Sequence, residues 1–210
     1  MTPPPPRPVP GHRQDGLHQQ YRDLLRERVL ETASTAATQF GWERVRIADL
    51  AKLSGVSRSA LARVFGDKDG IATALVAHEA DRVIARVGQA LLDAPNLEAG
   101  LLTALRIAVS AREGQPFLAA VLDADHGDTA LLPLLTTGSA PIIARARLML
   151  TTALRSRRPR LPTAVLDDAA DVVVRATLSH LTAPDHDPEA AVARLHRLAC
   201  RLLDVAVTPA

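Results

Sequence analysis

Aromatic side chains are scarce in this sequence: Phe, Trp and Tyr together make up 2% of its 210 residues. Four of the five fall in the N-terminal third (Tyr21, Phe40, Trp42 and Phe65), which leaves Phe117 alone in the rest of the chain. Because stacked aromatic rings are what recognises flat organic cations, this larger part cannot build an aromatic cage for them. A ligand cavity there would have aliphatic walls.

Cysteine is almost absent. The single thiol, Cys200, excludes a disulfide within one chain, and its neighbours Leu198, Ala199 and Leu202 predict that it packs as a small apolar residue. No apolar run approaches the ~20 residues that span a bilayer, and the proline-rich start lacks the apolar segment of a signal peptide. We therefore expect no membrane partner and a cytoplasmic location.

Signatures of catalysis are missing too. The sequence has no glycine-rich phosphate loop and no serine or cysteine beside a local base, and His78-Glu79 lacks a second histidine four residues later. Two groups remain as metal candidates: His186-Asp187, and the cluster Asp123, Asp125, His126 and Asp128. The first lies in a turn between two prolines, and the second has the pattern of a helix end followed by a cap. We expect no catalytic residue, no metal and no cofactor.

Hydrophobic residues, in contrast, make up 47% of the chain, so it can bury a substantial core. The net charge is only +2, but residues 1–66 hold 10 Lys or Arg against 6 Asp or Glu, while residues 67–210 hold 15 against 17. Basic charge thus concentrates in the N-terminal part. This modest imbalance favours nucleic acid as a partner of that part.

The hydrophobic pattern is helical throughout, and no stretch alternates as a β-strand does. Apolar spacing and capping residues predict helices over 67–92, 96–112, 115–125, 128–136, 139–158, 162–181 and 187–205. Residues 1–16 lack apolar periodicity and predict an extended or disordered arm, which is either a solvated tail or, through Arg7 and Arg13, a minor-groove contact. The predicted fold is all-α: this arm, a three-helix DNA-binding head at 17–66, and a helical bundle for effector binding and dimerisation at 67–210.

Residues 47–66, IADLAKLSGVSRSALARVFG, have the spacing of two short helices that cross tightly. Ala51 is small where the helices cross, and Gly55 can adopt the left-handed conformation that the turn requires. The turn and both helices supply apolar contacts for a small core: Leu50, Leu53, Val56, Leu61, Val64 and Phe65. This pattern predicts a helix-turn-helix.

The second helix of the pair has a polar face. Ser57 precedes it and is placed to cap its first amides. Arg58, Ser59 and Arg63 lie opposite the apolar positions, where they would reach bases or phosphates in a major groove. For the arginines alone, a solvated helix face is the simpler interpretation, but the crossing and turn residues favour DNA binding.

The run from Val29 to Ala77 resembles the DNA-binding head of TetR (tetracycline repressor) family regulators. The resemblance rests on Ile47-Ala48-Asp49-Leu50-Ala51, on Gly55-Val56-Ser57 and on the Phe65-x-x-Lys68 step into the next helix. It implies that Asp67 caps that helix and that Lys68 touches the DNA backbone.

Two positions depart from the family pattern. Ala62 stands where relatives usually carry an aromatic residue, and Arg46 replaces the threonine that often opens the first helix of the pair. Arginine cannot cap by accepting a hydrogen bond, but it can contact a phosphate. We therefore expect DNA binding to depend on Arg46, Arg58, Arg63 and Lys68.

The last two predicted helices carry apolar residues on more than one face, so a face of each must be covered by the chain itself or by a partner. The resemblance implies a four-helix interface with a second copy. Two recognition helices must also meet half-sites about 34 Å apart, which calls for a homodimer and a palindromic operator. The predicted interface residues are Val172, Val173, Leu178, Leu181, Leu195, Leu198 and Leu202.

The helices expected over 96–112, 115–125 and 128–136 are the predicted walls of an effector pocket. Their aliphatic composition suits a small hydrophobic effector, with fatty acyl or other lipid-like molecules as the first choice. A filled core without an effector is the alternative. The residues assigned to the pocket, some of them polar enough to anchor an effector head group, are His78, Arg82, Arg106, Phe117, Arg145 and Met149.

These features predict a one-component, ligand-responsive transcriptional regulator that we expect to be a repressor. It would bind double-stranded DNA as a dimer and release it when the effector binds. The alternative from another class is a helical enzyme or lipid-binding protein with a vestigial helix-turn-helix head.

Overall fold

The structure is a computed structural model that describes residues 12–123, 128–184 and 186–204. Within these ranges the chain forms eleven α-helices and one 3-10 helix and contains no strand, so the all-α prediction is confirmed. None of these helices is both long and apolar enough to cross a bilayer. The part of the predicted arm at residues 1–11 lies outside the described ranges.

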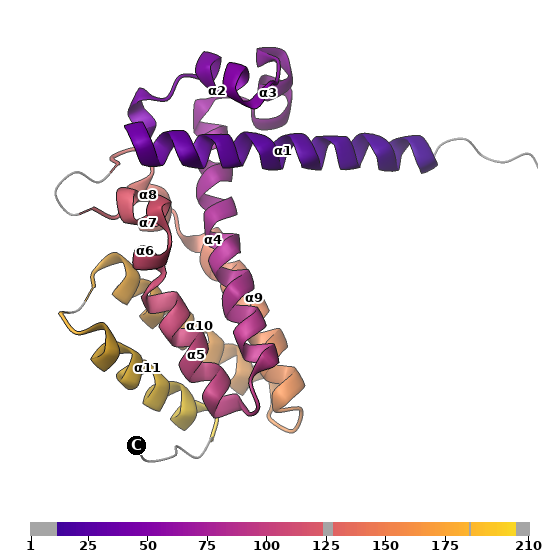
Figure 1. The fold of residues 1–210 in the computed structure, drawn as a ribbon. Coiled ribbons are helices and arrows are strands. Elements are labelled where there is room, and N and C mark those ends of the chain that lie inside the picture. The colour runs from indigo at the N-terminus through magenta and orange to yellow at the C-terminus, as the bar shows by residue number, and fades with distance from the viewer. Residues whose placement is uncertain (1–11, 124–127, 185, 205–210) are drawn as a thin grey trace, which may run out of the picture.

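The first helix, α1 (His12–Phe40), has 29 residues. It extends beyond the other helices of the head and projects past the body (Figure 1). The prediction of an arm is therefore wrong for residues 12–16, which form the first turn of α1 and the start of its second. No proline follows Pro10 in this stretch, so a helix nucleated further along the chain can propagate back through polar residues that tolerate helical conformation.

The rest of the head lies on one side of α1 and consists of η1 (Trp42–Arg44), α2 (Ile47–Ser54) and α3 (Arg58–Phe65). From there α4 (Lys68–Asp93) runs away from the head along the whole body (Figure 1). The Asp67 carboxylate accepts a hydrogen bond from the Gly70 amide at 2.8 Å and caps this helix. A single helix thus connects the head to the far end of the body.

The body consists of seven further helices: α5 (Leu97–Val109), α6 (Ala111–Gly114), α7 (Pro116–Val121), α8 (Leu132–Leu135), α9 (Ala140–Arg157), α10 (Thr163–Thr182) and α11 (Pro188–Leu202). Asn96 and Asp187 cap α5 and α11 by accepting from the amides of Ala99 and Ala190. The three predicted helices over 96–136 are shorter than expected. Ser110 separates α5 from α6, and α7 ends already at Val121.

Buried side chains form two clusters. One joins the head and the start of α4 to α6, α7 and α8, where Phe117, Leu118 and Val121 pack with residues of the head. The other joins the end of α4 to α5, α9, α10 and α11. The core of the head therefore continues into the body, across the expected division at residue 66.

The far end of α4 is fixed to α9. The Arg157 guanidinium donates to the carbonyl oxygens of Leu91, Leu92 and Ala94, each at 2.8 Å. These carbonyls lie at the C-terminal end of α4, where helices lack internal donors. One end of α4 is thus anchored in the body while the other end holds the head.

Candidate DNA-binding head and effector cavity

The turn between α2 and α3 has the geometry that its residues predict. Gly55 adopts the left-handed conformation, with φ 68° and ψ 28°, and the amide of Val56 donates to the carbonyl of Ala51 at 2.9 Å. Ala51 is buried where the helices cross. This hydrogen bond and the glycine fix the angle at which α3 leaves α2.

The small core beneath the turn differs from the prediction at one residue. Leu50, Leu61 and Phe65 are buried, and Val56 and Val64 pack against them, but Leu53 is 64% exposed. The buried face of α2 is formed by Leu50, Ala51 and Ser54, and Leu53 points to the side of it. Ser54, which sequence reasoning missed, is fully buried because its hydroxyl donates back to the Leu50 carbonyl at 2.5 Å.

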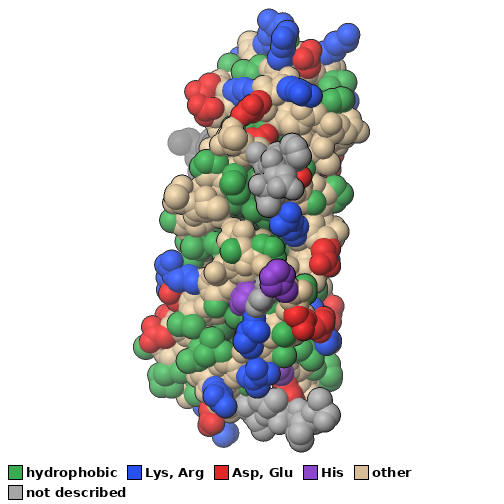
Figure 2. Space-filling view, turned by 90° about the vertical axis from the view of Figure 1, so that its left-hand side faces the viewer, with side chains coloured by type: hydrophobic (Ala, Val, Ile, Leu, Met, Phe, Trp, Pro, Cys, Tyr) green, Lys and Arg blue, Asp and Glu red, His purple; other side chains and the backbone are tan. Residues whose placement is uncertain are grey.

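The α3 helix presents its polar side chains to solvent. Ser57 caps the helix by accepting from the Ala60 amide at 3.2 Å, and Arg58 and Arg63 are exposed. Arg46 precedes α2 without making a side-chain cap. Within the described ranges, these three arginines form no ion pair. Figure 2 shows Lys and Arg side chains at the end of the molecule that the head forms.

Lys68 has internal partners. Its Nζ donates to the Glu43 carbonyl at 3.1 Å and lies 5.4 Å from the centre of the Trp42 ring. Lys68 therefore fastens η1 to the start of α4. A phosphate contact by Lys68 would have to share or replace these interactions.

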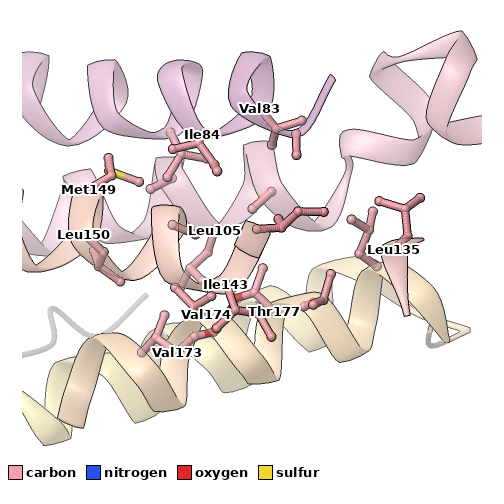
Figure 3. A pocket seen from close by; sticks show the side chains of 18 of the residues that line it. Val83, Ile84, Leu105, Leu135, Ile143, Met149, Leu150, Val173, Val174 and Thr177 are labelled. Atoms are coloured by element: carbon pink, nitrogen blue, oxygen red, sulfur yellow. Dashed lines mark hydrogen bonds between the residues drawn. The ribbon is translucent and has the colours of Figure 1, made fainter. Parts of the chain in front are cut away.

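An apolar cavity of about 130 Å³ lies in the body between α4, α5, α9 and α10 (Figure 3). Its labelled walls in Figure 3 are Val83, Ile84, Leu105, Leu135, Ile143, Met149, Leu150, Val173, Val174 and Thr177. Among the described residues of the lining, Thr177 alone carries a side-chain oxygen, and this hydroxyl already donates to the Val173 carbonyl at 2.7 Å. The cavity thus offers a ligand almost only carbon surface.

Of the six residues assigned to the effector pocket, Met149 alone lines this cavity. Phe117 is buried in the cluster below the head, and His78 is not in the lining. The three arginines instead pair with carboxylates: Arg82 with Glu79, Arg106 with Glu189, and Arg145 with Asp81. The assignment to the apolar cavity therefore holds for Met149 alone, because the arginines pair with carboxylates and the interior between these helices stays apolar.

The predicted interface residues also divide. Val173, Leu178 and Leu181 line the cavity, and Leu195 is buried in its own chain. Val172, Leu198 and Leu202 remain 43%, 38% and 37% exposed, and so does Val165 at 38%. Only the exposed residues are free to meet a second copy. Much of the apolar surface of α10 therefore lines the cavity and is not available for an interface.

The acidic and thiol groups have structural partners. The Asp128 carboxylate accepts from the amides of Ala130 and Leu131, each at 3.0 Å, in the turn before α8, whose N-cap residue is Leu131, while Asp125 and His126 lie outside the described ranges. Cys200 is buried, with its Sγ 3.4 Å from His196 Nε2. Burial, and then the charge of Glu98, raise the pKa of the Cys200 thiol. Among the described residues, no three His, Cys, Asp or Glu side chains are grouped to hold a metal.

Known proteins match both parts of this architecture. The family described as "Bacterial regulatory proteins, tetR family" matches residues 29–75, and "Bacterial Tetracyclin repressor, C-terminal domain" matches residues 96–201. The HTH-type transcriptional regulator AlkX of Mycobacterium tuberculosis (strain ATCC 25618 / H37Rv) is 32% identical over 183 residues, which cover 83% of this chain and 84% of that protein. The chain belongs to the TetR family. It is thus a transcriptional regulator whose helix-turn-helix head is its DNA-binding part.

Solved structures of TetR-family proteins share the fold. The TetR family repressor AlkX from Dietzia sp. strain DQ12-45-1b, implicated in biodegradation of n-alkanes, superposes with a TM-score of 0.72 at 25% identity, covering 86% of this chain and 96% of that one. The repressor QsdR of R. erythropolis superposes with a TM-score of 0.63 at 20% identity, covering 90% and 98%. At that lower identity the likeness to QsdR concerns the fold alone.

Proposed function

We propose that this TetR-family regulator is a repressor that binds a palindromic operator as a homodimer and leaves it when a neutral aliphatic effector enters the apolar cavity. One observation carries the proposal: α4, which holds the head at its N-terminal end, supplies Ala80, Val83, Ile84 and Val87 to the cavity wall. A ligand that displaces this wall acts directly on the position of the head.

Exposed arginines on the helix-turn-helix of the head support operator binding. Arg58 and Arg63 are exposed on α3, and Arg46 is exposed at the start of α2. Arginine gives the commonest specific contact to guanine in the major groove, and it also neutralises phosphates. We assign base or phosphate contacts to these three arginines, with Ser57 and Ser59 as polar neighbours at the first turn of α3.

The cavity wall selects the chemical class of the effector. A carboxylate inside it would be desolvated without a charged or hydrogen-bonding partner, because the hydroxyl of Thr177 is already engaged. A hydrocarbon chain has no such cost. The AlkX repressor of Dietzia is implicated in biodegradation of n-alkanes. Both points favour a linear hydrocarbon over the fatty acyl compounds that composition alone suggests.

The small volume of the cavity is the reason that a longer ligand would displace α4. An apolar cavity of about 150 Å³ holds one benzene molecule, so a cavity of about 130 Å³ holds only a short chain without expanding. A longer alkane must push α4 away from α9. Each buried methylene supplies about 0.8 kcal/mol, so three or four of them offset the roughly 2.7 kcal/mol that shifts a conformational equilibrium a hundredfold.

Two contacts resist this displacement. The Arg145 guanidinium of α9 forms an ion pair with Asp81 of α4 at 2.7 Å, and Gly88 lets α4 approach Met149 closely. The ion pair is half exposed and therefore contributes no more than about 1 kcal/mol. Binding energy from a few methylenes is enough to overcome it. The anchored far end of α4 then turns a local shift into movement of the head.

The exposed apolar residues of α10 and α11 support the dimer. Val165 and Val172 lie on α10, and Leu198 and Leu202 lie on α11. We assign the interface to these four residues. A dimer held by α10 and α11 carries one head on each copy, as a palindromic operator requires.

Selection of bound fragments from a random DNA pool tests this function. The proposal expects enrichment of an inverted repeat with half-sites about one helical turn apart, and loss of the complex when n-octane is added. Native mass spectrometry of the same complex reports whether two chains bind each duplex. If no sequence is enriched while the purified chain retains lipid, the alternative of a lipid-binding protein with a vestigial head is correct.

A further inference from the structure

A second cavity, of about 270 Å³, lies between head and body and is lined by residues of α1, α4 and α7 and their flanks. No residue lines both this cavity and the apolar one. Its walls are mixed polar and apolar. The residues used below are Thr35 and Thr38 of α1, Glu79 and Arg82 of α4, Gln115 before α7 and Phe117 within it.

Two buried acceptor atoms of the lining residues lack a donor, although Ser34, Gln39 and Arg82 of the same lining carry donors. The Oε1 atoms of Glu79 and Gln115 are buried and have no hydrogen-bond partner, and the two residues are 2% and 7% exposed. Thr35 and Thr38 use their hydroxyl protons on carbonyls of their own helix, at 3.0 and 2.8 Å, so their oxygens can only accept. A buried acceptor without a donor costs about 1–3 kcal/mol, and more when it is charged.

The nearby cation does not satisfy Glu79. The guanidinium of Arg82 lies 3.6 Å from Glu79 Oε1, too far for a hydrogen bond, and its side chain is 59% exposed. A carboxylate buried with such incomplete compensation favours any occupant that brings positive charge and donors. Because the Arg82 side chain is mostly exposed, the place of a hydrogen-bond donor to Glu79 Oε1 stays open to another cation.

We propose that this cavity binds a small organic cation through a primary ammonium group. An ammonium has three donors and no acceptor, which complements Glu79 Oε1, Gln115 Oε1 and a threonine oxygen. The ring of Phe117 gives apolar surface for a short alkyl chain. Because the walls come from α1, α4 and the start of α7, a bound cation bridges the head and the body. The site does not depend on the operator or on the aliphatic effector.

Calorimetric titration of the full chain with 1,4-diaminobutane and with propylammonium, in the absence of DNA, tests the site. We expect saturable binding of both and no binding of the neutral 1-propanol. Glu79→Gln should weaken the binding at least about tenfold, since it removes a charge-assisted bond. Glu113→Gln removes an exposed carboxylate of neighbouring α6, outside this cavity, and should leave the affinity unchanged.

The Arg82→Ala substitution should change the affinity for the ammonium probes in the opposite direction. It removes the only positive charge paired with Glu79 among the described residues, so the ammonium probes should bind more tightly. This variant decides the question if Glu79→Gln does not fold. Absence of saturable binding to the natural chain, equal binding by Glu79→Gln, or weaker binding by Arg82→Ala would each overturn the proposal and leave water as the occupant.

Discussion

The backbone N–H of Trp42 donates a hydrogen bond to the Asp128 carboxylate at 2.6 Å, and so joins the head to the loop that precedes α8. The other oxygen of this carboxylate accepts from the amides of Ala130 and Leu131 in its own loop. Beside it, the Thr129 hydroxyl donates to the Glu43 carboxylate. A single side chain thus organises the loop and holds η1 against the body.

Replacing Asp128 by alanine should destabilise the protein by about 1–3 kcal/mol, because three amides lose their acceptor. Chemical denaturation measures the loss, and hydrogen exchange at the Trp42 amide shows whether the head loosens first. Asp128→Asn keeps an acceptor oxygen and should lose clearly less. Equal losses for the two variants would mean that the hydrogen bonds to the head do not matter.

Two glycines of α4 predict contrasting effects of the same substitution. A Cβ at Gly70 would lie 1.9 Å from the backbone oxygen of Phe65, whereas one at Gly88 would meet the flexible Met149 side chain at 3.3 Å. Gly70→Ala should therefore cost about 3 kcal/mol or more. Gly88→Ala gains about 1 kcal/mol of helix propensity and should be close to neutral. Thermal melts of both variants test the packing of the head on α4, and similar melting temperatures would argue against it.

Structural features that depend on residues close together in the sequence could be predicted from it. The left-handed Gly55, the Ser57 cap and the Asn96 cap each depend on neighbours within four residues, so their residue types suffice to predict them. The spacing of apolar residues also predicted α4, α9 and α10, and the motifs of the head indicated its family.

What could not be predicted depends on contacts between distant segments. Arg145 was assigned to a pocket, but its partner Asp81 is 64 positions earlier in the sequence, on another helix. Val173 and Leu181 were assigned to a dimer interface, yet they face a cavity whose other walls are α4 and α9. Apolar periodicity shows that a face is covered and does not show by what.

Recognition of the operator should depend on the exposed arginines of α3. Arg58→Ala and Arg63→Ala should each weaken specific binding by about 1–3 kcal/mol, because each loses base or phosphate contacts, while thermal stability stays within about 0.5 kcal/mol of the natural chain. Fluorescence anisotropy with the selected operator measures the affinities. Arg155→Ala, at an exposed arginine in the last turn of α9, is the control. Unchanged affinity of both α3 variants would refute the assignment of this face to DNA.

The buried thiol gives a prediction about pH. Since burial raises the pKa of Cys200, the folded state holds the proton more tightly than the unfolded state does. The resulting stabilisation is fully present below the ordinary thiol pKa and is lost as the pH rises towards the raised value. A thiol reagent should therefore label Cys200 slowly at neutral and mildly alkaline pH and rapidly in denaturant. Rapid labelling of the folded chain at neutral pH would contradict the buried placement.

If an uncharged chain in the apolar cavity releases DNA by moving α4, two ligands of equal length that differ only in charge should act differently on the operator complex. The dissociation of the selected operator should be measured by fluorescence anisotropy with n-octane and with octanoate, for the natural chain, for Ala146→Leu, which narrows the cavity, and for Leu148→Ala, an exposed change on the same helix. We expect n-octane to release DNA from the natural chain and from Leu148→Ala, to act much more weakly on Ala146→Leu, and octanoate to have little effect on any of the three. Release by octanoate alone, or equal responses of Ala146→Leu and the natural chain, would contradict it.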